Sequence, residues 1–246
     1  MYKLYKGDCL EVMKEIPTGS VDMILCDLPY GTTECKWDFI IPLDRLWKEY
    51  ERIIKEDGAI VLTAAQPFTT QLIESNRKRF RYCWYWIKNT PTGFCFAKYQ
   101  PMRKVEDVCV FYKKAPKYNP QGVIKLDRPK SKNRRPQKHD EWIYSDSLNG
   151  KYEIGWTNYP NNVLQINVER GLHPTQKPVP LFEYLIKTYT DEGMTVLDNC
   201  MGSGTSGVAC MNTNRKFIGI EMDEKYFNVA KERIEGSLTQ GEKQWA

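Results

Sequence analysis

The stretch TVLDNCMGSGTSGVACM (195–211) decides the fold, because it runs from a short apolar strand through a glycine loop into a helical pattern. The strand covers 195–198 and the helical pattern covers 203–213. This succession is typical of α/β proteins, in which ligands bind outside the carboxyl ends of the strands. Asp198 ends the strand and would therefore stand at a ligand-binding edge.

The rest of the chain repeats this alternation of short apolar runs with helical periodicity. The periodicity predicts helices over 42–56, stopped by Asp57 and Gly58, and over 223–235. Further strands are predicted at 2–6, 21–26, 58–63, 82–87, 107–112 and 216–220. The pattern favours a mainly parallel sheet flanked by helices.

Composition narrows the class of protein. The 246 residues are enough to bury a full core, and no apolar run approaches the roughly 18 residues of a membrane span. The eight cysteines contain no C-x-x-C pair and the chain has only two histidines, so we expect reduced thiols and no zinc site. A soluble protein of the cytoplasm is predicted.

The alternation fails between 113 and 172, where basic residues gather and aromatic residues follow. Residues 113–138 contain ten Lys or Arg and one acid, against a net charge of +5 for the whole chain. Five aromatic residues come next: Trp142, Tyr144, Tyr152, Trp156 and Tyr159. This composition suits a segment that grips phosphates and stacks on bases. The alternative for 113–138 is a disordered loop.

The glycine loop fits two cofactors. Gly202, Gly204 and Gly207 match the dinucleotide fingerprint, and Glu221 follows where a ribose-binding acid is expected. Asp198, however, would face the pyrophosphate of NAD with a like charge. S-adenosylmethionine has no phosphate and carries an ammonium group that Asp198 can accept. Gly202 and Gly204 would let the backbone approach its methionine part.

Three motifs give the chain a family resemblance: DLPYG at 27–31, HPTQKP at 173–178 and DNCMGSGT at 198–205. In this order they resemble the β-class amino-methylating DNA methyltransferases, and among these the DNA adenine methyltransferases. The resemblance implies a Rossmann-like S-adenosylmethionine-dependent methyltransferase fold of permuted motif order. Residues 1–112 would form the catalytic half, 113–172 an inserted target-recognition region, and 173–246 the cofactor-binding half.

The resemblance also assigns roles at the cofactor. Asp8 would meet its adenine, and Thr175 and Lys177 its carboxylate. The remaining cofactor-binding residues are Asp27, Asp198, Gly202, Gly204, Thr205 and Glu221. Ordinary alternatives stay open, since Asp8 could be a helix cap and Lys177 a surface charge.

DLPY is the predicted catalytic motif. The exocyclic amine of adenine is a poor nucleophile, because its lone pair is delocalised into the ring. Acceptors on both N–H bonds would aim that lone pair at the methyl carbon, and we assign them to Asp27 and the Leu28 carbonyl. Leu28 stands where the family usually has proline, and Pro29 still holds it extended. Tyr30 would stack on a base flipped from the duplex.

The predicted function is site-specific methylation of the N6 amine of adenine in double-stranded DNA, without a metal. One alternative is methylation of the N4 amine of cytosine. Another is a DNA-binding module with a vestigial cofactor site, which Leu28 leaves open. The chain could serve a restriction-modification system, a phage or a solitary methylase, and the sequence is compatible with a homodimer.

Overall fold

The computed structural model describes residues 1–31, 38–133, 151–169 and 176–243. They form two compact units, Met1–Asn119 with Asn162–Ala246, and Pro120–Asn161. Thr175, Trp142 and Tyr144 lie outside the described residues.

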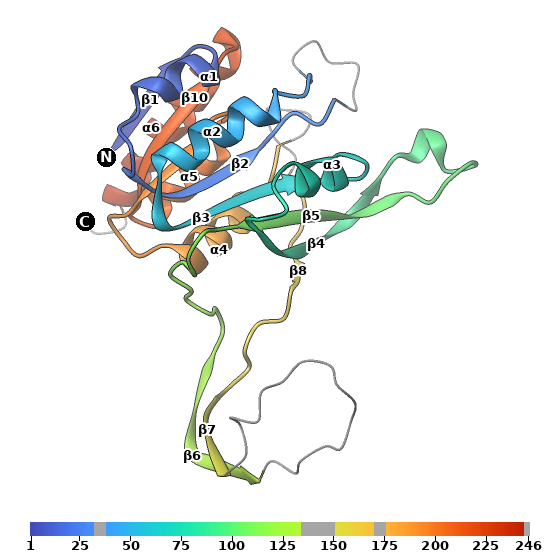
Figure 1. Ribbon diagram of the computed structural model, residues 1–246, viewed down its shortest axis with the longest axis vertical. Coiled ribbons are helices and arrows are strands. Elements are labelled where there is room, and N and C mark those ends of the chain that lie inside the picture. Colours follow the sequence, from blue (N-terminus) through green and yellow to red (C-terminus); the bar gives the residue numbers. More distant parts are fainter. Residues whose placement is uncertain (32–37, 134–150, 170–175, 244–246) are drawn as a thin grey trace. The chain divides into compact units, whose positions relative to one another are not determined.

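The larger unit is built on an eight-stranded sheet of order β1-β10-β9-β2-β3-β5-β4-β8 (Figure 1). Only β5 runs antiparallel to its neighbours, so the sheet is largely parallel. The strands are β1 Tyr2–Lys6, β2 Val21–Asp27, β3 Ile54–Ala64, β4 Phe80–Thr92, β5 Arg103–Phe111, β8 Val163–Gln165, β9 Thr195–Asp198 and β10 Lys216–Glu221.

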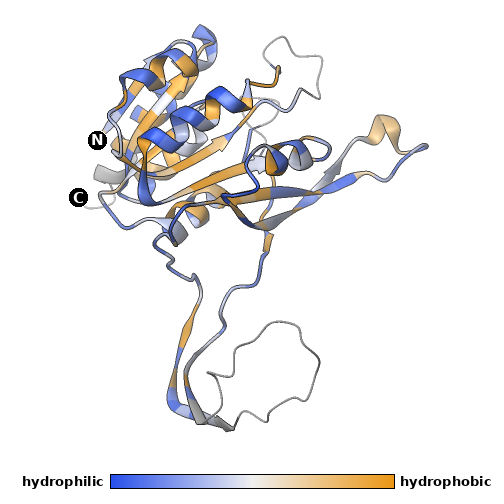
Figure 2. Ribbon diagram, viewed as in Figure 1, coloured by the Kyte–Doolittle hydropathy of each residue, from blue (hydrophilic) through white to orange (hydrophobic). Residues whose placement is uncertain are grey.

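Helices cover both faces of this sheet. They are α1 Cys9–Val12, α2 Leu43–Ile53, α3 Phe68–Ser75, α4 Val179–Tyr189, α5 Thr205–Asn212 and α6 Glu224–Lys243. Alternate residues of β2 divide between two cores: Met23 and Leu25 pack with α4, α5 and α6. Ile24 and Cys26 pack with α2 and α3 on the other face. The central strands are accordingly hydrophobic along most of their length (Figure 2).

The chain reverses its direction of winding between β9 and β2, which lie side by side in parallel. From β9 it passes through α5 to β10 on one side, and from β2 through α2 to β3 on the other. Such a switch point opens a crevice at the carboxyl ends of the strands. The last residues of these two strands are Asp198 and Asp27.

The predicted helix 42–56 was too long. Helix α2 ends at Ile53, and β3 begins at Ile54, which pairs with Val21. A Cβ on Gly58 would lie 2.6 Å from the Ile54 Cγ1 atom, so this glycine makes room for the isoleucine instead of stopping a helix. Here sheet pairing overrides a helical pattern.

The predicted recognition region is divided in the structure. Strand β8 falls within 113–172, yet it pairs with β4 at the edge of the main sheet. The separate unit covers only 120–161 and contains an antiparallel pair, β6 (Ile124–Asn133) with β7 (Lys151–Thr157). Within it, the Lys125 Nζ atom lies 5.9 Å from the centroid of the half-exposed Trp156 ring.

In the parts of the chain that are described, no helix is both long and apolar enough to cross a membrane.

Candidate active site

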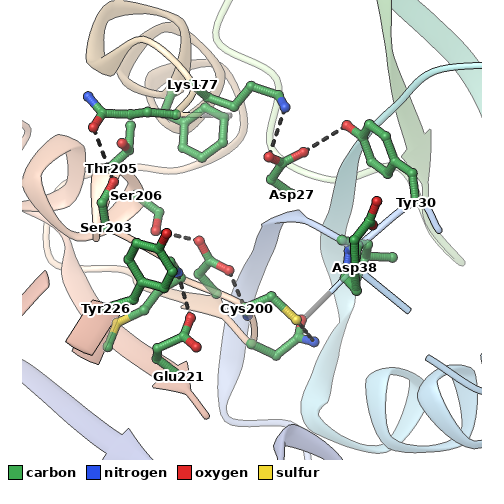
Figure 3. A pocket seen from close by; sticks show the side chains of 18 of the residues that line it. Asp27, Tyr30, Asp38, Lys177, Cys200, Ser203, Thr205, Ser206, Glu221 and Tyr226 are labelled. Carbon is green, nitrogen blue, oxygen red and sulfur yellow. Dashed lines mark hydrogen bonds and ion pairs between the residues drawn. The ribbon is translucent and has the colours of Figure 1, made fainter. Parts of the chain in front are cut away.

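A cavity of about 690 Å³ opens at the switch point of the larger unit. The ends of β2, β9 and β10 bring Asp27, Asp198 and Glu221 to its wall, and β4 and β5 add residues from the other side. Figure 3 shows Asp27 and Glu221 facing this common space from their separate strands. The structure therefore unites the two halves that the sequence analysis placed far apart along the chain.

The Asp27 carboxylate is held on both of its oxygens. Its Oδ1 atom accepts hydrogen bonds from the Tyr30 hydroxyl at 2.7 Å and from the Thr63 hydroxyl. Its Oδ2 atom accepts from the Lys177 ammonium at 2.8 Å. Thr63 pairs with Asp27 in the β2–β3 register, so neighbouring strand ends build this contact.

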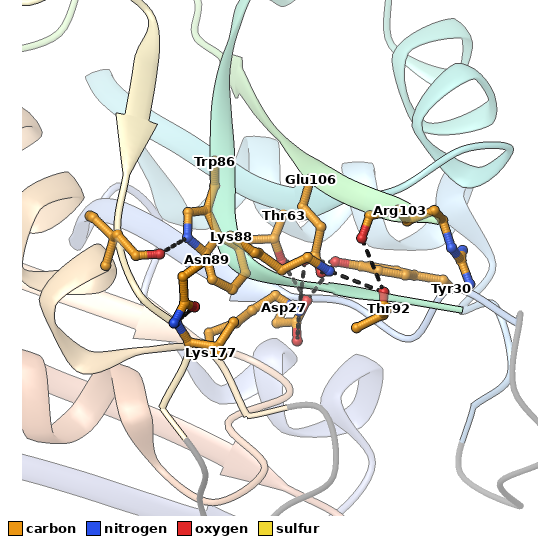
Figure 4. Close-up of polar contacts among 12 residues, drawn as sticks. Asp27, Tyr30, Thr63, Trp86, Lys88, Asn89, Thr92, Arg103, Glu106 and Lys177 are labelled. Atoms are coloured by element: carbon orange, nitrogen blue, oxygen red, sulfur yellow. Dashed lines mark hydrogen bonds and ion pairs between the residues drawn. The ribbon is translucent and has the colours of Figure 1, made fainter. Parts of the chain in front are cut away.

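Lys177 belongs to a buried network of four alternating charges (Figure 4). Its Nζ atom lies 3.4 Å from the Glu106 Oε2 atom. The Lys88 Nζ atom lies 2.9 Å from the other oxygen of that carboxylate, Oε1. Burial lowers the pKa of Lys177, but Asp27 and Glu106 outweigh it and the pKa is raised. For Glu106, burial is outweighed by the two lysines, and its pKa is lowered. Two carboxylates and two ammonium groups thus alternate in the cluster, and their formal charges cancel.

This placement differs from the role predicted for Lys177. The sequence analysis put it at the carboxylate of the cofactor or, alternatively, on the surface. In the structure it is buried and lies against Asp27.

Tyr30 packs within the wall of the cavity. Its ring stacks on Phe68 with centroids 5.2 Å apart, and the Lys177 Nζ atom lies 5.5 Å from its centroid. Burial, with the nearby Asp27 charge, raises the pKa of the Tyr30 hydroxyl. The hydroxyl therefore keeps its proton and serves as a donor to Asp27.

Leu28 and Pro29 follow Asp27 along the same wall. The Leu28 side chain is buried in the core shared with α2 and α3. Leucine at this position thus has a packing role in addition to any role of its carbonyl.

Asp198 is buried and accepts hydrogen bonds from neutral donors, the Ser206 hydroxyl at 2.5 Å and the Cys200 amide at 3.0 Å. Burial raises its pKa to about 6. A carboxylate in this setting lacks the compensating charge that Lys177 gives to Asp27, so a cationic ligand would stabilise its ionised form.

Glu221 ends β10 and holds the glycine loop. Its two oxygens accept from the Gly202 amide at 2.9 Å and the Asp223 amide at 2.8 Å. Burial again raises the pKa of this carboxyl. Asp198 and Glu221 therefore form a pair of partly desolvated acids beside one loop.

The two predicted loop glycines serve different purposes. Gly202 has a φ of +50° and open space around it, as a close approach to a ligand requires. Gly204 has a φ of +81°, and a Cβ there would lie 2.9 Å from the Ala230 Cα atom. It therefore lets the loop pack against α6, where we expected it to admit the cofactor.

Two further predicted residues line the cavity. The Thr205 Oγ1 atom is buried and has no hydrogen-bond partner among the described residues. Asp8 caps α1 by accepting from the Leu10 amide at 2.8 Å, which is the alternative that the sequence left open. Capping uses its Oδ1 atom, and the residue still borders the cavity.

Sequence reasoning missed four residues of the site: Thr63, Lys88, Glu106 and Ser206. Thr63 carried a signal, because it lies near the end of a predicted strand and such ends gather at one edge. Lys88 and Glu106 carried none, since their burial depends on how β4 and β5 pair.

Comparison with known proteins agrees with this geometry. The family model described as DNA methylase matches residues 21–232. The chain is 29% identical to the type II methyltransferase M.HpaI of Haemophilus parainfluenzae, over 96% of this chain and 75% of the relative. It is 27% identical to the DNA adenine methyltransferase YhdJ of Escherichia coli (strain K12), over 93% of this chain and 81% of the relative.

Solved structures resemble the whole chain as well. The complex of M1.HpyAVI with SAM has a TM-score of 0.63 and 26% identity, covering 95% of this chain and 100% of the other. The PvuII DNA methyltransferase (cytosine-N4-specific) has a TM-score of 0.69 and 18% identity, covering 97% and 92%. Because the identity to the PvuII enzyme is only 18%, this similarity shows the fold alone.

The chain belongs to the DNA methylase family. The predicted α/β methyltransferase fold and the predicted enzyme class, a DNA methyltransferase, are confirmed. The alternative of an NAD-binding glycine loop, which the fingerprint alone would have allowed, is not supported.

Proposed function

We propose that this chain transfers a methyl group from S-adenosylmethionine to the N6 amine of an adenine flipped out of double-stranded DNA. One observation carries the proposal: in a chain of the DNA methylase family, Asp27 and Asp198 end adjacent strands and face one cavity of about 690 Å³. The printed names of the relatives agree, since one is a DNA adenine methyltransferase and one solved structure is a complex with SAM.

The residues around the glycine loop fit S-adenosylmethionine. The raised pKa of Asp198 suits an acid that gains a cationic partner, so we assign it to the ammonium group. We assign Glu221 to the ribose hydroxyls, and the buried, unpartnered Thr205 hydroxyl to a polar group of the same ligand. Asp8 remains our candidate for the adenine end. When bound, S-adenosylmethionine supplies an electrophilic methyl group.

The β2 end then orients the target amine. Asp27 accepts a hydrogen bond from one N–H group of the amine, and the Leu28 carbonyl accepts one from the other. This arrangement directs the lone pair of the nitrogen toward the methyl donor. Proximity and alignment of the reacting groups supply much of the acceleration in such a reaction. The aromatic face of Tyr30, already packed on Phe68, borders the space for the flipped base.

In this proposal Lys177 holds the Asp27 carboxylate in place. Its ammonium, fixed between two carboxylates, donates to the Asp27 Oδ2 atom and limits the rotation of that carboxylate. An ionised carboxylate can only accept hydrogen bonds, and that is the property the target amine needs. Lys177 is therefore a positioning residue in the free enzyme.

Cytosine N4 is the second candidate for the target amine, and it shares the same two-acceptor requirement. The fold admits it, since the PvuII enzyme named above is specific for that amine. Adenine is favoured by the acid at position 27 and by the adenine-specific relative.

We assign the target-recognition role to the unit Pro120–Asn161, a narrower region than 113–172. Its β6 strand carries four basic residues between 125 and 132, which suits contact with phosphates.

The DNA substrate also leads us to propose a cytoplasmic location. A homodimer stays a separate proposal, and sedimentation of the free chain checks it by distinguishing one chain mass from two.

The test uses purified chain, S-adenosylmethionine with a labelled methyl group, and double-stranded DNA. Digestion to nucleosides followed by mass spectrometry should give N6-methyladenine as the labelled product. N4-methylcytosine as the main product would overturn the base assignment, and no labelled nucleoside from folded protein would overturn the function. Methylation-sensitive sequencing of the same DNA then gives the recognition sequence.

A further inference from the structure

The hairpin between β4 and β5 ends in exposed aromatic residues. Phe94, Phe96 and Tyr99 are 79%, 57% and 86% exposed, and we call these three the aromatic tip. Figure 1 shows this hairpin reaching out past α3. Large exposed apolar side chains gathered in one place mark an interaction site more often than a bare surface.

The backbone of the tip is folded into a short turn. Phe94–Phe96 form a 3-10 turn after Gly93, whose φ of +93° starts it. The Phe96 amide donates to the Gly93 carbonyl at 3.0 Å, and the Gln100 amide donates to the Phe96 carbonyl at 3.0 Å. The aromatic rings are thus presented on a defined turn, which lowers the entropy that binding would cost.

The charge around the tip is of one sign. Between 89 and 105 the chain has Lys98, Arg103 and Lys104 and no acid, and all three basic residues are exposed. Aromatic groups beside exposed positive charge suit a polyanion with flat apolar faces, which describes nucleic acid.

The base of the hairpin belongs to the catalytic cavity. Thr90, Thr92 and Arg103 line the same cavity as Asp27 and Tyr30. The Thr92 hydroxyl also accepts a hydrogen bond from the Lys88 ammonium at 3.2 Å. This bond connects the hairpin to the charged network around Asp27. The tip therefore continues a hairpin whose base lines the cavity that a target base must enter.

We infer that the aromatic tip wedges into the DNA stack next to the target and helps to keep the base flipped out. Inserted apolar side chains unstack base steps, and flipping costs least for a base that is already unpaired. Phe94 and Tyr99, the most exposed of the three, are the stacking residues. Lys98 and Lys104 contact phosphates beside them. This inference rests on the proposed function and concerns a surface outside the reacting atoms.

The test compares two substrates once the recognition sequence is known: a fully paired duplex, and the same duplex with the target adenine mispaired. The variant Phe94→Ala/Tyr99→Ala should lose about 10- to 100-fold in kcat/KM on the paired duplex, because stacking is lost. On the mispaired duplex its loss should shrink to a few-fold. Leu238→Ala, which removes an exposed apolar side chain from α6, is the matched control and should match wild type on both.

A second variant tests the charges without touching the aromatic rings. Lys98→Gln/Lys104→Gln should reduce the salt dependence of DNA binding by about one unit of slope per lost phosphate contact. Cofactor affinity, measured by calorimetry, should stay at the wild-type value in both double variants.

Equal losses on the two duplexes, or no loss on either, would overturn the wedge. So would a change in sedimentation of the free double variant with unchanged DNA activity, which would assign the tip to contact between two copies of the chain. Failure of the proposed function looks different, because the wild type itself would then methylate neither duplex.

Discussion

The neighbouring strand ends of β2 and β9 each carry a buried or half-buried acid, but in opposite electrostatic settings. Asp27, at the end of β2, pairs with Lys177 in a neutral cluster of four charges. Asp198, at the end of β9, accepts hydrogen bonds from a hydroxyl and an amide, and its pKa is raised to about 6 by burial.

This difference indicates which ligand each acid serves. A compensated acid is prepared for a neutral group such as an amine on a base, since its charge is already balanced and its geometry fixed. An uncompensated acid is stabilised when a cation arrives. We therefore propose that the same residue type marks the substrate end of the cavity in one strand and the cofactor end in the next.

The largest effect is expected from Asp27→Ala. Removing one of the two acceptors for the amine should lower methyl transfer by about 10²- to 10⁴-fold. Cofactor affinity should stay within a few-fold of wild type. Single-turnover transfer measures the first and calorimetry the second. Asp44→Ala, which removes an exposed acid from α2, should leave both unchanged, and substantial turnover by Asp27→Ala would refute the assignment.

Removing the compensating charge should destabilise the fold. Lys177→Met leaves Asp27 and Glu106 as neighbouring, partly buried carboxylates, and we expect the free energy of unfolding to fall by about 2–4 kcal/mol. Adding Glu106→Gln should recover part of this loss, because one unpaired charge disappears. Denaturant unfolding of the two single variants and the double variant measures the coupling. Purely additive losses would show that the four charges do not act together.

The raised pKa of Asp198 gives the cofactor end its own pH dependence. Below about pH 6 the carboxyl is protonated, so affinity for S-adenosylmethionine should fall by about tenfold per pH unit. Without ligand, the same group contributes stability below its usual pKa of 3.8 and loses that contribution as the pH rises through 6. Calorimetry and thermal unfolding between pH 4 and 8 should show both trends, and Asp198→Asn should flatten both.

Leu28→Pro should have the smallest effect on catalysis. Proline keeps the backbone carbonyl that we assign to the amine, so turnover should stay within a few-fold of wild type. The buried leucine side chain is lost, however, and the free energy of unfolding should fall by about 1–3 kcal/mol. A folded but inactive Leu28→Pro protein would show that the local backbone does more than present a carbonyl.

The sequence predicted the two ends of the cavity for physical reasons. Asp27, Asp198 and Glu221 each end an apolar strand, and parallel strands bring their ends to one edge. The spacing of the glycines in the loop, together with Asp198, predicted the cofactor end. The same reasoning placed four strands of the main sheet, β1, β2, β9 and β10, within one residue of their observed limits. Strands β3 and β5 start four residues earlier than predicted, and β4 ends five residues later.

The partners of those acids could not be predicted, because they depend on tertiary pairing. Lys177 reaches Asp27 from the chain that leads into α4, and Glu106 comes from the antiparallel strand β5. Strand β8 has only three residues, too few to show a period, and the packing of Gly204 against Ala230 depends on where α6 lies. The sequence shows the three aromatic residues of the tip, but it does not show that their side chains are exposed together.

The division of labour between the two acids is tested most directly by one calorimetric titration of S-adenosylmethionine at pH 7.5 into three proteins: wild type, Asp27→Asn and Asp198→Asn. We predict that Asp27→Asn binds within a few-fold of wild type. Asp198→Asn should bind at least about tenfold more weakly, since a charged hydrogen bond contributes roughly 1.5–3 kcal/mol. Equal affinities for all three proteins, or a loss confined to Asp27→Asn, would contradict the account.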